Sequence, residues 1–143
     1  MPQLESKNPV AVAKKITPLI CAGCKKIIAT LNMALFAEVW DSKTDKIVAV
    51  YAAHKGSCDN VLEDELPEGQ TTNWEEMSAA VIPARFVRTV MTTLNRMKDE
   101  PQLYTEQGFD DWKRMLLILS QYVCRETTPD ERAVLEHLDD FGL

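Results

Sequence analysis

The chain has 143 residues, of which 45% are hydrophobic and 27% are charged, and its formal net charge is −6. This is the size and composition of an ordinary globular protein with one domain or two small ones. No apolar run approaches the roughly 18 residues that a membrane-spanning helix needs. The N-terminus does not resemble a signal peptide, because Lys14 and Lys15 interrupt its apolar stretch. We therefore expect a cytoplasmic protein without a membrane partner.

The charge is unevenly distributed along the chain. Residues 1–60 hold eight Lys against five Asp or Glu, a net charge of +3. Residues 61–143 hold eight Lys or Arg against seventeen Asp or Glu, a net charge of −9. This acidic part would repel a phosphate backbone, whose neutralisation dominates nucleic-acid affinity. A nucleic-acid partner would therefore bind within the first 60 residues, which contain five lysines near the motifs described below: Lys25, Lys26, Lys43, Lys46 and Lys55.

Two β-strands are the first predicted elements, at residues 33–40 and 46–54. The second is rich in β-branched and aromatic residues, which favour strands. Residues 41–45 between them are polar and typical of a turn, so the pair predicts a β-hairpin. A short helix is then predicted over residues 59–66, where Pro67 ends it.

Four residues of metal-ligand type form two close pairs around this hairpin: Cys21 with Cys24, and His54 with Cys58. The hairpin returns the chain toward its start, which would bring the two pairs together. Three Cys and one His suit a closed tetrahedral zinc site, and Gly23 relieves the turn between the first two ligands. We predict one structural zinc ion per chain, bound by these four side chains.

A turn with two ligands, a hairpin, and two further ligands around a helix start together resemble the treble-clef class of zinc fingers, over residues 18–66. In the usual treble clef a Gly follows the first pair, where this chain has Lys25. The second pair is usually two Cys spaced by two residues, whereas His54 and Cys58 are spaced by three. A zinc ribbon is the alternative. The resemblance implies a structural metal rather than a catalytic one and leaves the function open.

Helices are predicted for the rest of the chain. Asn73 and Glu76 form a capping box, which predicts a short helix through Ile82, and Pro83 is placed to begin a second helix. The apolar residues of the second helix share one face: Phe86, Val87, Val90, Met91, Leu94 and Met97. A third helix has a similar stripe: Phe109, Trp112, Met115, Leu116, Leu119, Tyr122 and Val123. A last helix is capped by Thr128 and is predicted to bury four residues: Val134, Leu135, Leu138 and Phe141.

These elements predict an α+β fold in which an N-terminal zinc-stabilised β-hairpin module precedes a small C-terminal helical bundle. The acidic segment 63–70 is the predicted boundary, which gives a module at residues 1–66 and a bundle at residues 70–143. Cys124 is predicted to be a half-buried core residue and His137 a solvated one, so neither joins the ligand set.

Two other interpretations of the cysteines remain open. Cys21-Ala22-Gly23-Cys24 superficially resembles a thioredoxin-like active site, which would make the protein a thiol-redox enzyme. That fold needs a buried strand and a βαβ context around the motif, but only twenty residues precede Cys21. It also leaves His54 and Cys58 without a role. Alternatively, the four residues are scattered core positions, since a free Cys is commonly buried as a small hydrophobe.

The function that we expect is that of a non-enzymatic protein-interaction or regulatory protein. A closed set of four ligands leaves no open coordination position for chemistry. The acidic helical part would bind a protein partner with a basic surface. The alternatives are a nucleic-acid-binding regulator that uses the lysines of the zinc module, and the thiol-redox enzyme. The sequence does not predict an oligomeric state.

Overall fold

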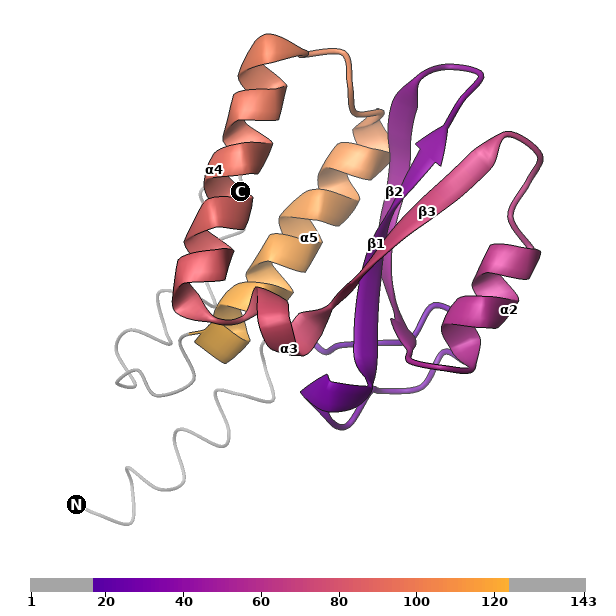
Figure 1. Ribbon diagram of the computed structural model, residues 1–143, viewed down its shortest axis with the longest axis vertical. Coiled ribbons are helices and arrows are strands. Elements are labelled where there is room, and N and C mark those ends of the chain that lie inside the picture. Colours follow the sequence, from indigo (N-terminus) through magenta and orange to yellow (C-terminus); the bar gives the residue numbers. More distant parts are fainter. Residues whose placement is uncertain (1–16, 124–143) are drawn as a thin grey trace.

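A three-stranded antiparallel sheet with two long helices on one face forms the centre of the computed structural model (Figure 1), which describes residues 17–123. The strand order is β2-β1-β3, with these bounds: β1 Ala34–Asp41, β2 Lys46–His54 and β3 Gln70–Glu76. The helical elements are η1 Leu31–Met33, α2 Cys58–Asp64, α3 Met77–Ala80, α4 Pro83–Asp99 and α5 Glu106–Val123. The predicted α+β class is confirmed. Within the described residues, no helix is both long and apolar enough to cross a membrane.

The predicted hairpin is confirmed as β1 and β2. Their register runs from Ala34 opposite His54 to Asp41 opposite Lys46, with one irregularity between Val39 and Trp40. Asp45 adopts a positive φ of 57° in the connecting turn, a conformation that Asp tolerates better than most residues. The hairpin therefore places the end of β2 beside the start of β1, where the two pairs of predicted ligands can meet.

The predicted helix from Asn73 to Ile82 is wrong in its first half, because residues 70–76 form strand β3. This strand pairs with β1 from Leu35 opposite Glu76 to Asp41 opposite Gln70. The open edge of β1 offers a ladder of backbone hydrogen bonds, which outweighs a capping preference worth about 1 kcal/mol. Helix α3 begins only after the strand. The sheet therefore extends across the predicted boundary at residues 66–70.

Helix α5 packs against β2 and closes the core. Trp112, Met115 and Leu119 of the predicted stripe are buried, and the Trp112 ring meets Phe36 of β1 edge-on at 6.2 Å between centroids. One continuous core includes these residues together with Cys21 and several buried residues of β1 and β2, such as Ala34 and Ile47. The predicted hairpin module and the C-terminal helices thus share a single hydrophobic core.

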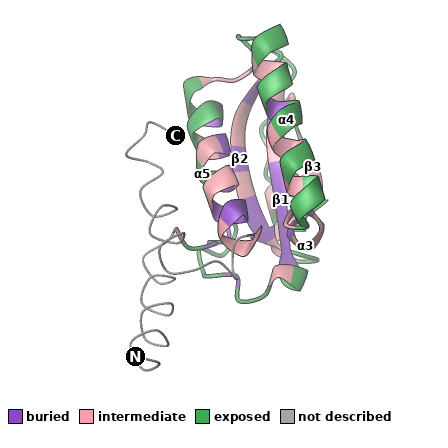
Figure 2. Ribbon diagram, turned by 90° about the vertical axis from the view of Figure 1, so that its left-hand side faces the viewer, coloured by how far each residue is buried: buried purple, intermediate pink, exposed green. Residues whose placement is uncertain are grey.

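Helix α4 does not bury its whole apolar face against the sheet, as an amphipathic surface helix is expected to do. Its Thr93 is buried with 3% of its surface exposed, whereas Val87, Met91 and Leu94 are 58%, 53% and 55% exposed. Figure 2 shows the long exposed surface of this helix on the side away from the sheet. The predicted apolar face of residues 83–99 therefore exists, but much of it points outward.

Arg96 anchors this orientation of α4 to the sheet. Its guanidinium donates to the Glu38 carboxylate of β1 at 3.1 and 3.3 Å, and it lies over the rings of Trp40 and Tyr104. Trp112 of α5 donates its indole N–H to the same carboxylate at 2.6 Å. The Glu38 side chain is only 13% exposed, so this partly buried network joins the sheet to both long helices.

Substituting Glu38→Ala is expected to lower the free energy of unfolding by about 2–3 kcal/mol, because two donors lose their partner in a partly buried site. Urea denaturation followed by tryptophan fluorescence measures the change. Lys113→Ala is the matched control: it breaks the ion pair with Asp110, which is longer at 3.8 Å and more exposed. Its effect should stay below about 0.5 kcal/mol. Equal effects of the two substitutions would show that the Glu38 network is not a stabilising contact.

The predicted last helix at residues 128–141 lies outside the described residues, as do Cys124 and His137.

Candidate metal centre

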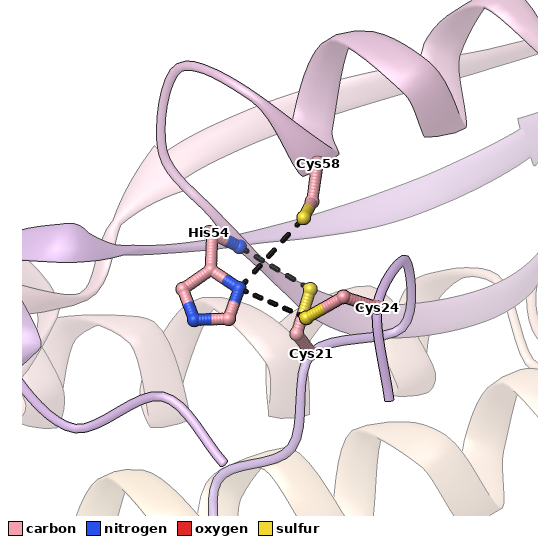
Figure 3. A group of neighbouring side chains, drawn as sticks. All are labelled: Cys21, Cys24, His54 and Cys58. Carbon is pink, nitrogen blue, oxygen red and sulfur yellow. Dashed lines mark hydrogen bonds between the residues drawn. The ribbon is translucent and has the colours of Figure 1, made fainter. Parts of the chain in front are cut away.

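The four predicted ligands come from three elements that the sheet brings together (Figure 3). Cys21 and Cys24 lie in a tight turn in which the Lys25 N–H donates to the Cys21 carbonyl at 2.9 Å. The Ala22 N–H donates to a β2 carbonyl at 2.8 Å, which ties this turn to the sheet. His54 is the last residue of β2, and Cys58 is the first residue of α2.

The ligand atoms converge on one point. The three Sγ atoms and one imidazole nitrogen all lie within 4.8 Å of one another. His54 Nδ1 lies 3.3 Å from Cys24 Sγ and 3.7 Å from Cys58 Sγ. A tetrahedron with Zn–S near 2.3 Å and Zn–N near 2.0 Å has edges of about 3.5–3.8 Å. The four side chains therefore lie close enough to hold a metal ion.

The surroundings of Cys21 favour a thiolate. This residue is fully buried, whereas Cys24 is exposed and Cys58 is intermediate. Burial raises the pKa of the Cys21 thiol, but hydrogen bonds from the backbone of Cys24, His54 and Gly23 outweigh it and lower the pKa to about 6. The hydrogen bond with Cys21 raises the pKa of Cys58. The buried sulfur is thus the one that the backbone prepares as an anion.

Gly23 approaches Cys58 so closely that any other residue at this position would force one of the two to shift. A Cβ atom built at Gly23 would lie 2.9 Å from Cys58 Cβ and 3.5 Å from its Sγ. The sequence suggested only that this glycine relieves the turn. The structure shows a second reason for it, which is that the first ligand turn packs directly against the fourth ligand.

We expect Gly23→Ala to weaken metal binding by about 10- to 100-fold, because the added methyl displaces Cys58 from the other ligands. Competition with a chromophoric chelator measures the dissociation constant. Gly69→Ala is the control, at a glycine whose φ of +89° makes the substitution strained but which contacts Ser42 and Lys43, not the ligands. It should lower stability and leave the metal affinity unchanged. Equal metal affinities of Gly23→Ala and the wild type would show that Gly23 does not approach Cys58 this closely.

The five lysines of the predicted nucleic-acid surface do not gather in one place. Lys25 and Lys26 flank the ligand turn, and Lys55 pairs with Glu76. Lys43 and Lys46 lie around the hairpin turn, at the opposite end of β1 and β2. Their positions give two separate groups of basic residues, three lysines at one end of the hairpin and two at the other, rather than one continuous basic surface.

Sequence reasoning missed the backbone part of the site. The His54 N–H donates to Cys21 Sγ at 3.4 Å, so His54 contributes through its backbone as well as its ring. Cys21 also forms a parallel bridge with Ala52 of β2, which fixes this buried residue against the sheet. Spacing patterns between Cys and His hold no signal for either contact.

Comparisons with known proteins do not assign the chain to a family: no family model matches it, and neither the curated proteins nor the solved structures include a match.

Proposed function

We propose that Cys21, Cys24, His54 and Cys58 bind one zinc ion per chain and that this ion is structural. The observation that supports the proposal most strongly is the convergence of four ligand atoms within 4.8 Å from three separate elements. Three thiolates and one imidazole form a donor set that favours zinc over harder cations. A full set of four protein ligands leaves no open position for a substrate or a reactive water.

The same geometry argues against a redox role for the Cys21–Cys24 pair. Cys21 is buried at 0% exposure, so a substrate disulfide has no access to the sulfur with the lowered pKa. His54 and Cys58 also point at the two sulfurs, a feature that a two-cysteine redox centre does not need. Zinc explains all four residues, whereas thiol-disulfide exchange explains two.

We further propose that the protein is a non-enzymatic interaction or regulatory protein whose metal centre positions a partner-binding surface. Cys58 is both a ligand and the first residue of α2, so a bound ion would fix the start of this helix. Helix α2 and the loop after it present four exposed carboxylates: Glu63, Asp64, Glu65 and Glu68. Val61 beside them is 51% exposed. An acidic surface with an apolar residue at its edge suits a protein partner with a basic surface.

Affinity capture with a charge-reversed control tests this function. The zinc-loaded protein should retain specific protein partners at physiological salt, and the double variant Asp64→Lys/Glu65→Lys should lose them. The matched control is Asp99→Lys/Glu100→Lys, which reverses two exposed carboxylates at the far end of α4. It should retain the partners. Equal capture by all three proteins, or none by any, would contradict the proposed surface.

A salt titration with duplex DNA and with RNA separates this function from nucleic-acid binding. We expect no nucleic-acid binding whose affinity falls steeply with salt, because the five lysines of the predicted nucleic-acid surface are divided between two ends of the sheet. A steep negative slope of log affinity against log salt would instead show phosphate contacts.

A further inference from the structure

The outer face of α4 is an apolar stripe that no described residue covers. Val87, Met91 and Leu94 follow one another at spacings of four and three residues, so they lie along one side of the helix. Each exposes more than half of its surface. Single exposed apolar residues are ordinary, but a row of them on an amphipathic helix is typical of a contact surface.

The stripe cannot turn inward, because the opposite side of α4 is fixed to the sheet. Arg96 is held by Glu38, and the buried Thr93 donates its hydroxyl to the Thr89 carbonyl at 2.8 Å. Between this side of the helix and the sheet lies a cleft of about 520 Å³, with Arg85 and Arg88 in its lining. The inner side of α4 thus includes Phe86, which packs on the core, as well as Thr93 and Arg96. The apolar stripe on the outer side is left for another segment to cover.

Charge distinguishes between the segments that could cover it. Helix α4 holds three Arg and one Lys against one Asp, a net charge of +3. A second copy of α4 would therefore be repelled, and so would residues 1–16, which hold three Lys against one Glu. Residues 124–143 hold two Arg against six Asp or Glu, a net charge of −4. The C-terminal segment is the one with complementary charge.

The sequence of this segment also matches the stripe. Residues 128–141 begin with a capping box and place four apolar residues on one helical face: Val134, Leu135, Leu138 and Phe141. A helix of this length would span about 21 Å. The distance along the axis from Val87 to Leu94 is about 10 Å, so the segment is long enough to cover the stripe.

The connection to this segment is long enough as well. Helix α5 runs antiparallel to α4, so its end at Val123 lies beside the start of α4 (Figure 1). The four residues 124–127 span up to about 14 Å when extended, whereas packed helices are separated by about 8–10 Å. The chain can therefore return along the outer face of α4 immediately after α5.

We propose that residues 128–141 dock as an amphipathic helix on the apolar stripe of α4 in the same chain. The acidic side chains of the segment then lie near Arg88 and Lys98, which are exposed and border the stripe at helical spacings of three and four residues. The four apolar residues of the segment cover Val87, Met91 and Leu94. This docking is independent of the metal centre, so it stands or fails separately from the proposed function.

Hydrogen exchange followed by mass spectrometry on the full, zinc-loaded chain tests the docking. In the wild type, backbone amides of residues 128–141 should exchange at least about tenfold more slowly than in an unstructured chain. Leu94→Asp should remove this protection, because it places a charge under the apolar face of the segment. Val87→Asp should do the same at the other end of the stripe. Amides of β1 and β2 should keep their protection in both variants.

Asn95→Asp is the matched control, since it adds the same charge at the next, also exposed position of α4. It should leave residues 128–141 protected. An unprotected segment in the wild type would overturn the proposal, and so would protection that survives both Leu94→Asp and Val87→Asp. Repeating the measurement at about 1 and 100 μM separates the chain's own segment from a second copy. Protection that rises with concentration would also overturn it.

Discussion

His54→Ala and Cys58→Ser should each abolish stoichiometric zinc binding and lower the free energy of unfolding by more than about 4 kcal/mol. Each variant leaves three of the four converging ligand atoms, and the remaining thiolates then repel one another without an ion. The turn at Cys21 loses its attachment to α2. Binding energies of structural zinc sites are on the order of 10 kcal/mol, which is comparable with the stability of a whole domain.

Comparing the effect of a chelator on the wild type and on His54→Ala isolates the contribution of the bound ion to stability. Chelation should destabilise the wild type strongly and should have almost no effect on His54→Ala, because that variant has no bound ion to lose. Cys124→Ser is the matched cysteine substitution outside the ligand set and should bind zinc like the wild type. If His54→Ala or Cys58→Ser binds zinc as tightly as the wild type, the four-ligand centre is wrong. Calorimetry measures the zinc affinity of each variant and, with and without chelator, its stability.

Gly108→Ala should lower the free energy of unfolding by about 2–4 kcal/mol, although Ala is normally favoured over Gly in a helix by about 1 kcal/mol. A Cβ at this position would lie 2.3 Å from the Ile47 carbonyl oxygen, which is backbone and cannot rotate away. That oxygen also accepts the Thr105 N–H at 3.0 Å, and the Ile47 N–H donates to Leu103 at 2.8 Å. The added methyl would push the start of α5 off β2.

Asn95→Ala is the control for Gly108→Ala, because it introduces the same residue at an exposed position of α4. It should change stability by less than about 0.5 kcal/mol. Thermal unfolding by circular dichroism compares the two variants. A Gly108→Ala protein as stable as the wild type would show that α5 does not pack this closely on the hairpin. The two would then not share one hydrophobic core as described.

The hairpin and the ligand set were predictable because their signals are local. The β-branched and aromatic residues of β2 and a five-residue polar turn predict the hairpin, whose pairing brings His54 back to the start of β1. Spacing singled out the four side chains that the structure brings close enough to hold a metal ion. The glycine approach to Cys58 was not predictable, because it depends on how two separate turns pack.

Strand β3 and the orientation of α4 were not predictable for a different reason. Residues 70–76 have weak local preferences, and the partner that makes them a strand is the edge of β1, about 35 residues earlier. For α4, the spacing of apolar residues identified the apolar face but not whether that face points toward the sheet or away from it. Arg96 decides the direction by pairing with Glu38, which is 58 residues away in the sequence. Both outcomes depend on contacts between distant segments.

The metal content of the purified protein shows whether the four side chains at the end of the hairpin bind zinc. Native mass spectrometry, together with elemental analysis of the same sample, gives the number and identity of bound ions. We predict one zinc per chain in the wild type and in Cys124→Ser, and none in a His54→Ala/Cys58→Ser double variant. A wild-type chain with far less than one zinc after expression in zinc-replete medium, or a double variant that retains a full equivalent, would rule out the four-ligand zinc centre.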